Sequence, residues 1–146
     1  MAEADHRYDC LLLERQLCFP LYACSKEIIR RYKPMLDELD LTYTQYIAMM
    51  VMWDKETLNV KELGEYLFLD SGTLTPLLKT LEKKGFVSRE RSKEDERNLV
   101  VKVTDKGMKL RDKAIDIQSK MAGCIKIDPK DAKELYTLLH KILGEF

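Results

Sequence analysis

The chain has 146 residues, which is the size of one ordinary domain. Its 25 basic and 25 acidic residues cancel, which argues against a general polycation but leaves room for a local basic surface that binds DNA. No stretch approaches the roughly 20 apolar residues that a membrane helix needs, and the N-terminus is too polar for a signal peptide. We therefore expect a cytoplasmic protein that makes no membrane contact.

The first predicted element is a helix. Apolar residues recur at helical spacing from about Tyr8 to Tyr32, and Pro34 is expected to end the helix just beyond them. Pro20 lies inside the pattern, so it must either kink this helix or stand in its first turn.

Three shorter helices are predicted next, each opened by a small polar capping residue. They are expected over 45–54, 60–67 and 71–84, with caps from the segment 42–44, from Asn59 and from Asp70, and with Gly85 as the stop after the third. The period then changes: two strands, 86–91 and 98–104, flank a polar hairpin loop. Two further helices are predicted, one from about residue 104 to 121 and one that opens at 128–131.

This order predicts a mainly α fold with a small β-hairpin, namely a winged helix-turn-helix. The terminal helices are too apolar to stand alone, so we expect them to form a dimerisation region in a homodimer. The chain is treated as one domain. Residues from about 1 to 40 and from 105 to 146 are assigned to dimerisation, and residues from about 44 to 104 to the winged helix-turn-helix, with its wing at 86–104.

Two segments carry candidate DNA contacts. The third short helix opens with small polar residues, which allow a close approach to the major groove, and the hairpin carries basic residues of the kind that read a minor groove. An ordinary capped helix and a solvated charged turn are the alternatives for these two segments. The candidate DNA-binding residues are Ser71, Gly72, Thr73, Thr75, Lys79, Arg89, Asp95 and Arg97, with Asp95 expected to orient Arg97.

The segment from Asp70 to Lys79, followed by the Asp95-x-Arg97 pattern and Val103-Thr104, resembles the MarR family of winged-helix repressors. The resemblance covers about residues 10–120. It implies an obligate dimer bound to a palindromic double-stranded operator, with Arg97 in the minor groove.

The N-terminal block from Leu17 to Cys24, together with the tyrosine-containing segments 32–34 and 41–46, is similar to the OhrR branch, which senses organic hydroperoxides. That resemblance implies that Cys18 is the reactive thiol and that Tyr32 and Tyr43 of the partner subunit hydrogen-bond its sulfur. Such bonds favour the thiolate, which is the form that attacks a peroxide.

The resemblance implies that oxidation of Cys18 gives a sulfenic acid, which either remains the end product or condenses with a second thiol to a disulfide. The second thiol is either Cys124, which lies where some members of the branch carry a resolving cysteine, or a low-molecular-weight thiol. The spacing of the four cysteines shows no Cys-x-x-Cys pair, so neither a structural zinc site nor a disulfide framework is indicated. No metal and no cofactor is expected.

Three other functions remain open at this point. The chain could be a MarR-type repressor released by a small aromatic or phenolic ligand. It could be a thiol peroxidase that uses Cys18, although no Cys–His pairing or phosphate-binding glycine loop accompanies that residue. It could also be a protein-interaction module that has lost DNA binding, in which case steep salt dependence of DNA affinity would be missing.

Overall fold

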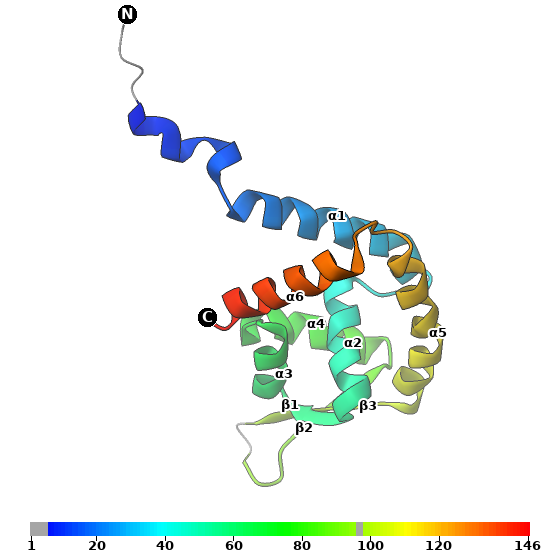
Figure 1. Cartoon of the computed structure of the whole chain (residues 1–146). Helices are drawn as coiled ribbons and strands as arrows, with labels where there is room; N and C mark the ends of the chain where they lie inside the picture. The colour runs from blue at the N-terminus through cyan, green and yellow to red at the C-terminus, as the bar shows by residue number, and fades with distance from the viewer. Residues whose placement is uncertain (1–5, 96–97) are drawn as a thin grey trace, which may run out of the picture.

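The computed structural model describes residues 6–95 and 98–146, and it is mainly helical with one small sheet (Figure 1). Two short 3-10 helices come first, followed by six α-helices and three strands in the part of the chain that the structure describes. In chain order the elements are η1 (His6–Leu11), η2 (Leu13–Arg15), α1 (Cys18–Asp37), α2 (Tyr43–Lys55), β1 (Thr57–Asn59), α3 (Val60–Leu67), α4 (Ser71–Lys83), β2 (Val87–Arg91), β3 (Leu99–Val103), α5 (Asp105–Ala122) and α6 (Pro129–Leu143).

Helices α3 and α4 form the helix-turn-helix, and the hairpin β2–β3 forms the wing, so the predicted fold is confirmed. The sheet has a third strand that the sequence did not indicate: β1 pairs antiparallel with β3, and the strand order is β1-β3-β2. Leu58 and Arg89 therefore both lie opposite Val101, one on each side of the central strand. This pairing ties the wing to the segment between α2 and α3.

The predicted capping residues do cap their helices. Thr42 and Asn59 each form a complete capping box, in which the side chain three residues later returns a hydrogen bond to the cap. Asp70 accepts from the Thr73 amide at the start of α4. A cap of this kind contributes about 1 kcal/mol to helix stability, and it fixes where each helix of the DNA-binding unit begins.

The first helix differs from the prediction at both ends. It begins at Cys18, ten residues later than Tyr8, and it continues through Pro34 to Asp37. Pro20 occupies the first turn, where a backbone amide has no helical partner and a proline is tolerated. The helix survives Pro34 because Leu36, beyond it, is only 1% exposed in the core, and burial of a leucine outweighs one lost hydrogen bond.

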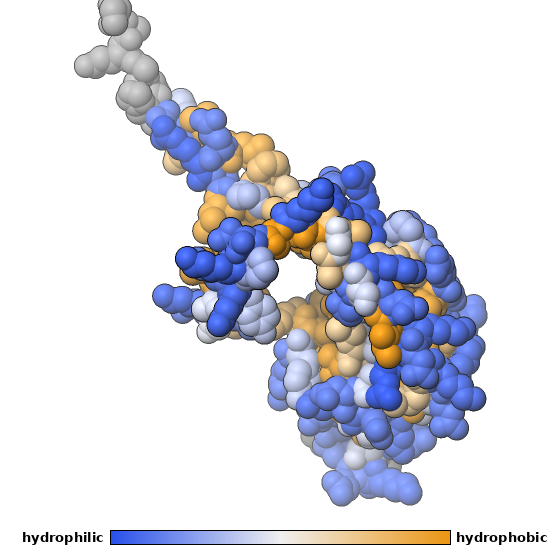
Figure 2. Space-filling model, turned by 45° about the vertical axis from the view of Figure 1, so that its right-hand side comes forward, coloured by the Kyte–Doolittle hydropathy of each residue, from blue (hydrophilic) through white to orange (hydrophobic). Residues whose placement is uncertain are grey.

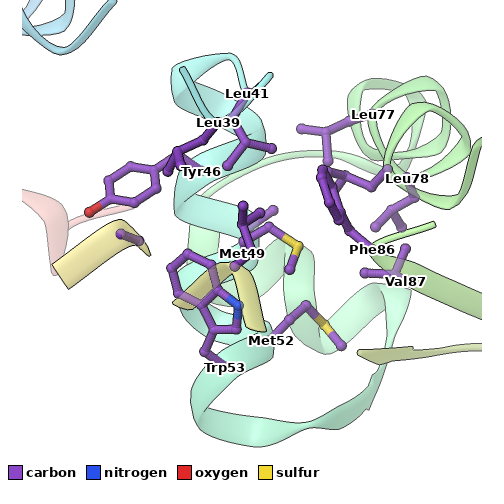
Figure 3. Close-up of a cluster of buried hydrophobic side chains, with 14 of the residues drawn as sticks. Leu39, Leu41, Tyr46, Met49, Met52, Trp53, Leu77, Leu78, Phe86 and Val87 are labelled. Carbon is purple, nitrogen blue, oxygen red and sulfur yellow. The ribbon is translucent and has the colours of Figure 1, made fainter. Parts of the chain in front are cut away.

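The core is built around α2 (Figure 3). The α2 side chains Met49 and Met52 are fully buried between α4 and the start of the wing. Figure 3 shows Leu77, Leu78 and Phe86 opposite these methionines, with Trp53 on the near side of α2. This core holds the recognition helix and the wing in one unit.

The ends of the chain carry apolar side chains that this core does not cover. The 3-10 helices project away from the winged-helix unit (Figure 1), and Figure 2 shows apolar surface along them. Leu11 is 74% exposed, and α6 has no buried residue at all. Exposed apolar faces of this extent mark an interaction surface, as the predicted dimerisation helices require. Among the described residues, no helix is both long and apolar enough to span a bilayer.

Candidate DNA-binding surface and thiol site

The recognition helix α4 presents the predicted polar residues to solvent. Its buried side consists of leucines at positions 74, 77, 78 and 81. Ser71, Thr75 and Lys79 are spaced four residues apart, so they share one exposed face. These side chains are accessible, as a DNA contact requires, and their contact with DNA remains a prediction.

The start of α4 is held by hydrogen bonds around Asp70. The Asp70 carboxylate accepts from the Thr73 amide at 2.9 Å and from the Thr73 hydroxyl at 3.0 Å. These bonds hold the pKa of Asp70 below its usual range. The Thr75 hydroxyl donates to the carbonyl of Ser71 at 2.7 Å. Both threonine hydroxyl protons are thus already used, and their oxygens remain as acceptors.

Arg89 occupies a different position from the one expected of a DNA contact. Its guanidinium donates to Glu82 at 2.6 and 3.0 Å, and its backbone amide donates to the same carboxylate at 3.1 Å. The Arg89 side chain is only 17% exposed. The pairing fixes β2 against α4, so we correct the sequence interpretation: Arg89 holds the wing to the recognition helix, and its guanidinium is not presented to DNA.

This ion pair makes stability depend on pH. Hydrogen bonds from Arg89 lower the pKa of Glu82 below its ordinary 4.5, so the folded chain binds fewer protons there than the unfolded chain. The contribution is present above about pH 4.5 and is lost as the pH falls through the lowered pKa. The midpoint of thermal unfolding should fall as the pH is lowered from 5 to 3, roughly the range in which carboxylates titrate. We expect this fall to be smaller in Glu82→Gln. Arg89→Met should have the same effect, and the double variant should add nothing; additive effects would contradict the pairing.

The described part of the wing loop is polar and structured by local hydrogen bonds. The Ser92 hydroxyl accepts from the amides of Glu94 and Asp95, and the Asn98 side-chain amide donates to Asp95 at 3.3 Å. Arg97, and with it the predicted Asp95–Arg97 pairing, lies outside the described residues. Both remain predictions from the sequence.

Cys18 is exposed as the first residue of α1. Its neighbours Leu17 and Phe19 and the nearby Tyr22 are also exposed, so the thiol stands on an apolar surface. Tyr32 lies 14 residues further along the same helix, which corresponds to about 21 Å at 1.5 Å per residue. One chain therefore does not bring Cys18 to its predicted tyrosine partners, and a contact between them requires the second subunit.

The two predicted tyrosines do lie together. The rings of Tyr32 and Tyr43 are 5.2 Å apart between centroids. Burial raises the pKa of both hydroxyls, so at neutral pH they are protonated and can donate hydrogen bonds. A small apolar hollow of about 210 Å³ lies beside Tyr43 between α1 and α2, with Ile29 and Leu36 among its lining residues.

The tyrosine pair continues into a row of aromatic contacts that the sequence did not reveal. Tyr46 lies 5.9 Å from Tyr32 and 6.2 Å from Trp53 between centroids. The indole of Trp53 donates a buried hydrogen bond of 2.8 Å to the carbonyl of Gly107 at the start of α5. Helical spacing could have revealed this row from the sequence, since Tyr43, Tyr46 and Trp53 lie on one face of α2. The row connects the tyrosine pair to the base of the wing.

Cys124 is half-buried just after α5. Arg31 of α1 donates a hydrogen bond to its carbonyl. Cys18 lies 13 residues before Arg31 on the same straight helix, about 20 Å away, whereas a disulfide needs Cα atoms within about 7 Å. The fold of one chain therefore keeps the two predicted redox cysteines apart. In the described residues we find no group of three side chains that could hold a metal ion.

Comparison with known proteins identifies clear relatives. A family model described as "Transcriptional regulator SarA/Rot" matches residues 30–114. The organic hydroperoxide resistance transcriptional regulator of Bacillus subtilis is 47% identical over 95% of each chain, which confirms the predicted resemblance to that branch. The regulator SarZ of Staphylococcus aureus is 45% identical over 91% of this chain and 90% of its own. The structure of reduced AbfR of Staphylococcus epidermidis bound to DNA has a TM-score of 0.78 at 30% identity and covers 97% of this chain and 99% of its own.

Proposed function

Because this chain belongs to the SarA/Rot family of transcriptional regulators, we propose that it is a dimeric DNA-binding repressor that organic hydroperoxides release from its operator. The single observation that carries the proposal is the exposed Cys18 on an apolar surface at the start of α1, in a chain 47% identical to a regulator named for organic hydroperoxide resistance. A regulator of this kind acts on chromosomal DNA, which makes the cytoplasm its place of action.

The oxidation itself needs one thiol and one peroxide. The Cys18 thiolate attacks the outer oxygen of the hydroperoxide, an S–O bond forms and the O–O bond breaks. The sulfur becomes a sulfenic acid, and the alkoxide that leaves takes a proton from water to become an alcohol. The protonated hydroxyls of Tyr32 and Tyr43 from the partner subunit would donate to the sulfur and favour its anion. The apolar hollow beside Tyr43 suits the organic part of the peroxide better than it suits water or hydrogen peroxide.

In this proposal, oxidation acts on DNA through the dimer geometry. A helix-turn-helix dimer reads half-sites about 34–36 Å apart, so a small change in subunit arrangement separates the two wings from their grooves. Loss of the sulfur–tyrosine hydrogen bonds would free Tyr32 and Tyr43 to repack. Through Tyr46 and Trp53 they contact the segment at Gly107 that supports the wing.

The DNA surface in this proposal consists of Ser71, Gly72, Thr73, Thr75 and Lys79 on α4, with Asp95 and Arg97 at the wing. The relatives are regulators, so we further propose that Cys18 is oxidised once per subunit and does not turn over as a peroxidase. A thiol donor that drove many rounds of peroxide reduction per subunit would contradict this part.

A band-shift experiment on the protein's own promoter DNA tests the proposal. Cumene hydroperoxide should weaken operator binding of the reduced wild type by a factor on the order of 10 to 100, the usual range of allosteric coupling, and dithiothreitol should restore it. Cys18→Ser should bind the operator like the wild type and should not respond to the peroxide. Cys24→Ser, an exposed thiol two turns further along α1, serves as the matched control and should respond normally.

Two results would overturn the proposal. If Cys18→Ser still leaves the operator on peroxide treatment, the sensing thiol lies elsewhere. If the wild type stays bound, the chain is a DNA-binding regulator of another signal, and small aromatic acids become the ligands to test.

A further inference from the structure

The turn between α3 and α4 contains an aromatic residue in an unusual backbone conformation. Phe68 has φ 54° and ψ 40°, which is the left-handed region. For a bulky residue this conformation is strained, whereas glycine adopts it freely. The turn itself requires it, because the amides of Phe68 and Leu69 both donate to the carbonyl of Gly64.

The ring of Phe68 does not compensate for this strain by packing in the core. Its side chain is 62% exposed, so most of the apolar surface that a buried phenylalanine would remove from water remains hydrated. A residue with a strained backbone and a large apolar side chain exposed to water is a candidate for a binding role.

Phe68 lines an open groove with a volume of about 680 Å³. One wall is the start of α3, including Lys61, and the other is the loop end of the wing at Leu99. Ser71 and Thr75, two of the proposed DNA contacts, lie in the same groove. The groove is therefore continuous with the DNA-binding face of α4.

We propose that this groove takes the DNA strand that borders the major groove, and that the ring of Phe68 packs on a deoxyribose of that strand. The assignment rests on the proposed function. Lys61 is the cation among the residues that line the groove, and Glu65, 4.0 Å from Lys61, and Asp70, which accepts from the Thr73 amide, are its anions. Ser71 and Thr75 in the same groove direct it to the DNA backbone, and a phenyl ring suits the apolar face of the sugar between two phosphates. A sugar contact adds affinity for DNA of any sequence.

Phe68→Gly separates a DNA contact from a structural role. Glycine fits the left-handed turn without strain, so the dimer should keep a Tm close to that of the wild type. Affinity should fall about tenfold both for the operator and for an unrelated duplex, because the dimer loses two sugar contacts. The slope of log affinity against log salt should not change, since the ring carries no charge and releases no counterion.

Two further variants complete the test. Phe68→Tyr keeps a ring of the same size and should retain wild-type affinity. Glu56, at the end of α2, also has a positive φ, 59°, and it does not line the groove. Glu56→Gly therefore relieves a strained backbone position without removing a groove residue, and it should not weaken DNA binding. Wild-type affinity of Phe68→Gly would overturn the inference while leaving the repressor function intact. A loss confined to the operator would also overturn it, because the ring would then read a base, and failure of the wild type to bind DNA would instead remove the proposed function.

Discussion

Gly107→Ala should destabilise the folded dimer more than any ordinary glycine-to-alanine change in a helix. A Cβ at this position would stand 2.1 Å from the carbonyl oxygen of Phe86 and 2.9 Å from the Val103 side chain. The oxygen belongs to the backbone, so it cannot move aside as a flexible side chain would. Overpacking of a closed site costs 1–3 kcal/mol and sometimes more, and the backbone clash places this variant at about 3 kcal/mol or above.

The position is unusual because three structural units meet there. The carbonyl of Gly107 accepts the buried hydrogen bond from Trp53, and its amide donates to the capping hydroxyl of Thr104. Phe86 directly precedes β2, and Val103 is the last residue of β3. Any shift that accommodates a methyl group therefore strains the core, the α5 cap and the wing at once.

Thermal unfolding followed by circular dichroism measures the effect, at one fixed protomer concentration because the dimer dissociates as it unfolds. A loss of about 3 kcal/mol corresponds to a Tm lower by roughly 6–12 °C for a chain of this size. Gly123→Ala is the matched control at the other end of α5: its φ is −80° and the nearest atom to its Cβ is 3.7 Å away. Equal Tm values for both variants would show that the segment at Gly107 is not closely packed.

The sequence predicted the elements whose signals are local. Thr42, Asn59 and Asp70 cap their helices as expected, because a cap is read from a few adjacent residues. The start of α1 was wrong by ten residues, since the leucines at 11–13 satisfy a helical pattern without a core to pack against. The continuation through Pro34 was missed for the opposite reason: the deciding contact is the burial of Leu36 by distant elements.

In the candidate site, too, features set by local sequence could be predicted and features set by distant partners could not. The exposed polar face of α4 follows from its own leucine spacing, so Ser71 and Thr75 could be placed from sequence. The role of Arg89 could not, because its partner Glu82 is on another element and a strand position does not reveal whether a guanidinium is already bound. Strand β1 was missed because three residues are too few for a period, and only the pairing of Thr57–Asn59 with β3 defines it.

Peroxide should join the two subunits covalently. In one chain Cys18 and Cys124 are held apart by most of the length of α1, with Arg31 fixing the Cys124 end. A disulfide between them must therefore connect two subunits, and two-fold symmetry would produce it twice. The Cys124 thiol attacks the sulfenic sulfur of the partner's Cys18, an S–S bond forms, and the oxygen leaves as water.

A non-reducing gel separates this route from a mixed disulfide with a small thiol. The oxidised wild type should migrate at twice its 17.1 kDa chain mass, and Cys124→Ala should migrate as a monomer at every peroxide concentration. Cys10→Ala and Cys24→Ala, which remove exposed thiols, should cross-link like the wild type. A cross-link that persists in Cys124→Ala would assign the resolving role to another cysteine. A wild type that remains monomeric, with its mass increased by one small thiol, would show that Cys18 is resolved from solution.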